Sequence, residues 1–108
     1  MQGPHSLTSS NVDKRVDDRI GVYRLYNSRS GPVRYVGMST DLASRLKQWT
    51  DEYEYFEYGY HSSKAAAYRS EATLYHRHGG KEELDNDRHP PRPHRQVKCP
   101  VCGIHSAV

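Results

Sequence analysis

The sequence lacks any apolar run long enough to cross a bilayer, and its N-terminus lacks the apolar stretch of a secretory signal. These absences lead us to expect an intracellular, cytoplasmic protein without a membrane partner. Hydrophobic residues make up only 34% of the chain, and its mean hydropathy is −0.99. We therefore expect a small core, and 108 residues suffice for one domain at most.

Cysteine, tryptophan and phenylalanine are scarce, whereas tyrosine is abundant. The chain has two cysteines, one tryptophan and one phenylalanine against nine tyrosines. The cysteines could form a disulfide, but an intracellular setting favours metal or redox chemistry. The tyrosines are typical of a sheet whose rings are half-buried while their hydroxyls meet solvent.

The chain also has no large excess of charge of one sign. Sixteen Lys and Arg residues face thirteen Asp and Glu residues, for a formal net charge of +3. This balance is compatible with binding to nucleic acid but is far from that of a polycationic tail. Charge alone therefore assigns no partner.

Short apolar runs predict a sheet. Residues 20–26 and 33–38 form two such runs, and the Arg-Ser-Gly-Pro sequence at 29–32 between them favours a hairpin. Residues 53–60 are dense in aromatic side chains and predict a third strand.

A helix is predicted directly after the hairpin. Ser39 or Thr40 can cap it, and Leu42, Leu46 and Trp49 recur at spacings of four and three, which gives one buried stripe.

A second helix is predicted from about residue 64 to residue 78. Ser62 or Ser63 can cap its start, and Gly79-Gly80 can end it. One side of this helix carries Ala67, Glu71, Leu74, Tyr75 and His78.

The chain divides into three parts. Residues 1–19 are predicted to be a mobile arm that could contain helix near its end, because Leu7, Val12 and Val16 are too sparse to define a buried face. Residues 20–93 form the compact module, and the prolines at 90, 91 and 93 close it because they cannot continue a helix. Residues 94–108 form a tail.

The module contains the side chains that phosphodiester hydrolysis requires. This reaction needs a positioned water, a base, a positive charge near the phosphate and usually a divalent metal. Glu71 suits Mg²⁺, which keeps several waters and needs only one or two carboxylates, and Arg45 offers a planar fork of donors to phosphate. Tyr23 or Tyr35 would be the base only with help from a nearby charge, because the pKa of tyrosine is near 10.

Five landmarks in this order resemble those of the GIY-YIG nucleases. They are the tripeptide Gly-Val-Tyr ending at Tyr23, the tripeptide Tyr-Val-Gly beginning at Tyr35, then Arg45, Glu71 and Asn86. The match spans residues 20–93. The resemblance implies an α+β fold in which a small three-stranded antiparallel sheet is flanked by helices, and single-metal cleavage of DNA with Mg²⁺ or Mn²⁺.

The resemblance also implies a role for each landmark. Tyr23 would be the general base, and Tyr35 would hold the water or the phosphate. Arg45 would stabilise the transition state, Glu71 would bind the metal, and Asn86 would orient the site.

One position departs from the family. Many members carry a histidine one helical turn after the arginine, where this chain has Trp49. Tryptophan cannot transfer protons, so that role is either absent or filled by His61 or His76.

Each candidate also has a structural interpretation. Tyrosines can be scaffold of the sheet, Arg45 can belong to a solvated helix face, and a helical glutamate is by default on the surface. Asn86 lies between Asp85 and Asp87, a sequence that also favours a turn.

The tail contains half of a zinc site. Cys99 and Cys102, in the sequence Cys-Pro-Val-Cys-Gly, have the spacing of one zinc knuckle. The other ligands would be His105 with His94 or His89, or an identical pair from a second chain. The alternative is a disordered tail with two free thiols.

Several basic residues are candidates for sequence-independent contacts with DNA phosphates, although ordinary solubility would also explain them. They are Arg69, Arg77, Arg88, Arg92, Arg95 and Lys98. No recognition module is evident, so specificity would come from loops, the arm, the tail, a homodimer or a partner protein. The alternatives to an endonuclease are a catalytically weak nucleic-acid-binding or structural module, and a zinc-mediated interaction protein.

Overall fold

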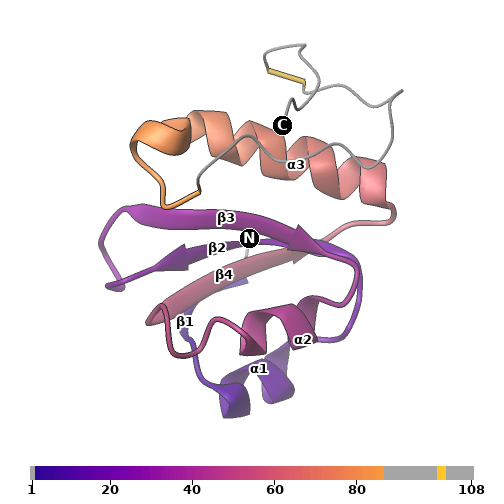
Figure 1. Ribbon diagram of the computed structural model, residues 1–108. Coiled ribbons are helices and arrows are strands. Elements are labelled where there is room, and N and C mark those ends of the chain that lie inside the picture. Colours follow the sequence, from indigo (N-terminus) through magenta and orange to yellow (C-terminus); the bar gives the residue numbers. More distant parts are fainter. Residues whose placement is uncertain (1, 87–99, 102–108) are drawn as a thin grey trace.

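A four-stranded antiparallel sheet is the middle layer of the protein, with helices on both faces (Figure 1). The computed structural model describes residues 2–86 and 100–101. The α+β class predicted from the sequence is confirmed. In chain order the elements are β1 (Gln2–Ser6), α1 (Ser9–Arg15), β2 (Gly21–Tyr26), β3 (Val33–Ser39), α2 (Leu42–Lys47), β4 (Tyr55–Tyr60), α3 (Lys64–Arg77) and the 3-10 helix η1 (Gly80–Glu82).

The sheet has the strand order β1-β4-β2-β3, so the expectation of three strands is wrong by one. The extra strand comes from residues 1–19, which were predicted to be an arm. A mobile arm is wrong for residues 2–16, because β1 pairs with β4 and α1 follows it, although helix in this segment had been allowed for. Leu7, Val12 and Val16 are each at most 5% exposed. They enter the core from a loop, a short helix and its C-cap, so they share no single periodicity that a sequence could reveal.

The predicted hairpin is confirmed. β2 and β3 pair with Tyr23 opposite Gly37 and with Leu25 opposite Tyr35. β4 pairs with the other side of β2. It begins at Tyr55 rather than Tyr53, because the backbone N–H of Tyr53 donates to the carbonyl of Trp49 in the turn that precedes the strand.

The sheet separates two apolar clusters because successive side chains of a strand point to opposite faces. On one face, Tyr23, Leu25 and Phe56 pack with the residues of α1 and α2. On the other face, Val22 and Val36 pack against α3. Figure 1 shows α3 on one side of the sheet and α1 with α2 on the other.

The helix ends show one prediction confirmed and one corrected. Ser63 caps α3 by accepting a hydrogen bond from the N–H of Ala66 at 3.1 Å, as predicted. α2 begins one residue later than predicted, with Asp41 at its N-cap position, because the Ser39 hydroxyl instead accepts from the N–H of Asp41.

The end of α3 also agrees with the sequence, since Gly79 and Gly80 follow it with φ of +92° and +62°. α3 is 14 residues long. In the described part of the chain, no helix has the length and apolar character needed to cross a membrane.

Candidate active site

Tyr23 and Tyr35 lie side by side on the face of the sheet that packs against α2. Their ring centroids are 6.3 Å apart, and the rings are inclined by only 15°. Tyr23 is 1% exposed, and its ring crosses the backbone of β3 at Gly37. Because β3 is an edge strand, the Tyr23 hydroxyl is directed toward the margin of the sheet.

Both glycines of the two tripeptides are required by close contacts. A Cβ on Gly37 would lie 2.4 Å from Cζ and Oη of Tyr23. A Cβ on Gly21 would lie 2.5 Å from the carbonyl oxygen of Gly59 and 2.8 Å from a methyl group of Leu42. Gly21 thus allows β2 to pack closely against β4 and α2. Gly37 leaves the space that the Tyr23 ring occupies.

Gly37→Ala is expected to destabilise the protein by about 3 kcal/mol, because the added methyl group must displace the Tyr23 ring from a packed core. Urea denaturation would measure this loss. In a Tyr23→Val background, the same change should cost less than about 1 kcal/mol, because the obstructing ring is gone. Equal costs in the two backgrounds would show that the ring is not the cause.

Trp49 takes the position at which many GIY-YIG nucleases carry a histidine, and it contacts the candidate catalytic group directly. Its indole Nε1–H donates a hydrogen bond to the Tyr23 hydroxyl at 3.0 Å. Its ring also packs against Tyr35 and Tyr53, with centroids 4.7 and 5.8 Å away. The sequence excluded proton transfer by Trp49 but did not reveal this contact. The signal for it was the shared spacing of Leu42, Leu46 and Trp49, which directs all three toward the sheet.

Of the two histidines considered as substitutes, His61 follows β4 and lines a cavity on the α3 side of the sheet. His76 lies on α3 and is partly buried. Among the described residues, Trp49 and not a histidine is bonded to the Tyr23 hydroxyl.

The electrostatics of Tyr23 link four of the five predicted site residues. Burial raises its pKa above the usual value, and the neighbouring Tyr35 and Glu71 raise it further. The hydrogen bond from Trp49 and the charge of Arg45 act in the opposite direction. Tyr23 is therefore a neutral phenol at neutral pH, and Tyr35, Arg45 and Glu71 are all near enough to influence it.

Arg45 lies on the exposed side of α2. It makes no ion pair with any residue that the structure describes. Its positive charge is thus available to an anion that approaches Tyr23.

Glu71 is buried on α3, with only 7% of the residue exposed. Burial raises the pKa of its carboxyl group to about 8. Its Oε1 atom has no hydrogen-bond partner in the described part of the chain. A buried carboxyl oxygen without a partner is rare, because it loses its hydration without compensation.

This unpartnered oxygen fits a ligand for a divalent cation. Within residues 2–86 and 100–101 there is no group of three or more His, Cys, Asp or Glu side chains that could hold a metal. Mg²⁺ does not need such a group, because it is commonly held by one or two carboxylates together with waters and substrate phosphates. Glu71 therefore stays the candidate ligand for such an ion.

Both polar atoms of the Asn86 side chain bind the backbone of the edge strand β3, so neither is left to contact a substrate. Its Oδ1 accepts from the N–H of Val36 at 3.0 Å, and its Nδ2 donates to the carbonyl of Val36 at 2.7 Å. The side chain thus extends the sheet by one pair of hydrogen bonds, at the residue between Tyr35 and Gly37. This contact fixes the strand that carries Tyr35.

Asn86→Ala is expected to destabilise the protein by about 2–3 kcal/mol, since it leaves two backbone groups of Val36 without their buried partners. Thermal denaturation would measure this. The matched control is Asp85→Ala, which removes exposed contacts to Arg34 and Tyr53 and should cost less than about 1 kcal/mol. Equal losses at the two positions would contradict a specific role of the Asn86 amide.

The other predicted site residues divide into two groups. Arg69 and Arg77 lie exposed on α3. The remainder lie outside the described residues: the candidate zinc ligands Cys99, Cys102, His105, His94 and His89, and the candidate phosphate contacts Arg88, Arg92, Arg95 and Lys98.

No family model matches the chain, and searches of curated proteins and of solved structures found no match. The resemblance to GIY-YIG nucleases therefore depends on the five landmarks of the sequence alone.

Proposed function

We propose that this protein is a metal-dependent DNA endonuclease that hydrolyses phosphodiester bonds at the site formed by Tyr23, Tyr35, Arg45 and Glu71. The observation that supports it most is the buried Glu71 carboxyl group, whose Oε1 lacks a hydrogen-bond partner among the described residues and which is near enough to Tyr23 to raise the pKa of that phenol. A purely structural module gains nothing from such a group, because it costs stability.

Glu71 would hold Mg²⁺ or Mn²⁺ in this proposal. Such an ion supplies positive charge against the negative charge that develops on the phosphate. Glu71 must be ionised to bind it, and the nearby cation would lower the raised pKa of its carboxyl group.

Tyr23 would orient the attacking water. Its hydroxyl oxygen already accepts the Trp49 indole N–H, so its own proton can be donated to a further oxygen. Arg45 lowers the pKa of Tyr23, and it would also bind the scissile phosphate. Tyr23 would accept the proton of the water only when these positive charges act on it together.

Tyr35 and Asn86 would have positioning roles. Tyr35 stacks beside Tyr23 and contacts Trp49, so it would hold the water or the phosphate against the reacting group. Asn86 would keep Tyr35 in place through the backbone of Val36.

The test is the conversion of supercoiled plasmid to nicked or linear DNA by the wild-type protein with Mg²⁺, with Mn²⁺ or with EDTA. We expect cleavage only with a divalent cation, and a loss of at least about 100-fold for Arg45→Gln. Arg15→Gln, which changes an exposed arginine on α1, is the matched control and should cleave normally.

Substrate form is the second part of this test. Single-stranded and branched DNA should be offered beside the plasmid, because the landmarks do not select among them. Binding without metal-dependent cleavage of any substrate would refute the endonuclease and support a nucleic-acid-binding module on the same fold.

A further inference from the structure

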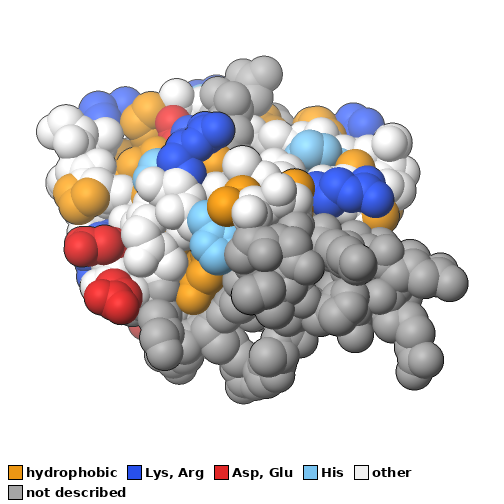
Figure 2. Space-filling view, turned by 90° about the horizontal axis from the view of Figure 1, so that it is seen from above, with side chains coloured by type: hydrophobic (Ala, Val, Ile, Leu, Met, Phe, Trp, Pro, Cys, Tyr) orange, Lys and Arg blue, Asp and Glu red, His pale blue; other side chains and the backbone are white. Residues whose placement is uncertain are grey.

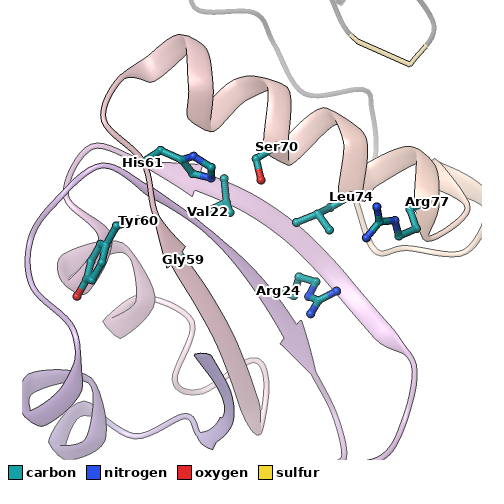
Figure 3. A pocket seen from close by; sticks show the side chains of 8 residues that line it. All are labelled: Val22, Arg24, Gly59, Tyr60, His61, Ser70, Leu74 and Arg77. Atoms are coloured by element: carbon teal, nitrogen blue, oxygen red, sulfur yellow. The ribbon is translucent and has the colours of Figure 1, made fainter. Parts of the chain in front are cut away.

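A cavity of about 360 Å³ lies between α3 and the strands β2 and β4 (Figure 3). It is on the face of the sheet opposite to Tyr23 and Tyr35, because Val22 and Arg24 alternate with Tyr23 along β2. Its volume is at the lower end of the range for small-molecule sites. The lining groups that matter here are Val22, Arg24, His61, Ser70, Leu74 and Arg77.

The cavity is basic. Arg24 and Arg77 are permanently charged, and none of the described residues that line the cavity carries a carboxylate. Two contacts fix the Arg24 guanidinium group. Its Nη2 forms an ion pair with Glu57 at 2.6 Å, and its Nη1 lies 3.3 Å from Nε2 of His78. Arg77 makes no ion pair with a described residue, so its charge remains uncompensated there.

His78, which directly follows Arg77 in the chain, lies beside the Arg24 guanidinium group. Burial lowers the pKa of this histidine, the charges of Arg24 and Arg77 lower it further, and the carboxylate of Glu57 acts in the opposite direction. Both cations therefore act on the same point beside the cavity. Two convergent cations at a concave surface attract an anion more strongly than a single exposed arginine does.

The lining has two chemical parts. Figure 3 shows Arg24 and Arg77 toward one end of the cavity and His61 at the other, with Ser70 and Leu74 on α3 between them. Val22 and Leu74 provide an apolar wall along the middle. The ring of Tyr60 points away, toward the opposite face of the sheet, so it leaves the space open.

We propose that this cavity binds a phosphate monoester, with the phosphate at Arg24 and Arg77 and the organic part along Val22 and Leu74. Planar guanidinium groups match the geometry of phosphate oxygens, and His61 and Ser70 offer polar contacts to the organic part. The cavity has room for a unit about the size of one nucleotide. Such a group occurs in a free nucleoside monophosphate and at the 5′-phosphorylated end of a DNA strand.

Isothermal titration calorimetry of the full chain in EDTA tests this site separately from cleavage. The ligands are deoxyadenosine 5′-monophosphate, deoxyadenosine without phosphate, and a short oligonucleotide with and without a 5′-phosphate. We expect the monophosphate to bind and deoxyadenosine not to bind. Phosphate-dependent binding of the oligonucleotide would identify a strand end as the ligand, whereas its failure to bind would identify the free nucleotide.

Arg77→Gln is the decisive variant, because the side chain is exposed and its loss should leave the fold intact. It should weaken binding of the monophosphate at least about tenfold. Arg69→Gln, an exposed arginine on the same helix outside the cavity, should bind as the wild type does. Absence of binding at millimolar monophosphate, or equal binding by the Arg77 and Arg69 variants, would overturn the proposal.

Discussion

Glu71→Gln should reduce metal-dependent DNA cleavage by about 10³-fold or more. Glutamine keeps the size of the side chain and its capacity to accept hydrogen bonds, but it has no charge with which to bind a divalent cation. The measurement is the initial rate of plasmid nicking at saturating Mg²⁺ or Mn²⁺. Circular dichroism of both proteins would show that the fold is retained.

The control for this experiment is a glutamate that is not buried. Glu52→Gln changes an exposed residue in the turn between α2 and β4 and should leave the rate unchanged. A Glu71→Gln rate within about tenfold of the wild-type rate would refute the metal-ligand role of this residue. Normal cleavage by both variants would point to a different site or a contaminating nuclease.

The second large effect concerns the pH dependence of stability without metal. The pKa of Glu71 is about 8 in the folded protein against an ordinary value of 4.5. Between these two values the unfolded chain has released a proton that the folded chain retains. Stability contributed by this group is therefore complete below about pH 4.5 and is lost as the pH rises toward 8. The loss over this window is on the order of 3–5 kcal/mol.

Glu71→Gln isolates this effect because glutamine does not titrate. In EDTA, the free energy of unfolding measured with urea should fall by this amount from pH 5 to pH 8 relative to the variant, so the variant should be the more stable protein at pH 8. Adding Mn²⁺ at pH 8 should restore stability to the wild type but not to the variant. Parallel pH profiles of the two proteins would contradict a raised pKa.

The parts of the fold that the sequence predicted have local signals, either an apolar run or residues that cap and end a helix. The strands around Tyr23 and Tyr35 are short apolar runs on either side of turn residues, and α3 is bounded by Ser63 and Gly79, so these elements could be placed from the sequence. β1 and α1 could not, because Leu7 and Val12 are isolated apolar residues in polar surroundings. Their burial depends on pairing with β4, which is about fifty residues away.

The candidate site was predicted in composition but not in geometry. The sequence identified Glu71 and Arg45, because a carboxylate can bind a metal ion and a guanidinium group can bind phosphate. It did not reveal that the Asn86 amide binds both backbone groups of Val36, or that Trp49 donates to Tyr23. These contacts join residues that are 26 to 50 positions apart in the chain. Local sequence patterns cannot show which distant residues meet in the fold.

The basic cavity was missed for the same reason. Arg77 was predicted only as one of several phosphate contacts, and Arg24 was not singled out at all. Arg24 is on β2 and Arg77 is on α3, so only the packing of the helix against the sheet brings them to one cavity (Figure 3). Figure 2 shows Lys, Arg and His side chains spread over the face seen from above, with several acidic side chains among them toward one side.

The bond between Trp49 and Tyr23 has an optical consequence. Because Trp49 is the single tryptophan of the chain, all of its indole fluorescence originates beside the Tyr23 hydroxyl. Tyr35 and Tyr53 lie within 6 Å of the indole ring and can pass their excitation energy to it. The fluorescence emission of the unlabelled protein should therefore change when an oligonucleotide, a cation or a change of protonation alters the surroundings of this hydroxyl.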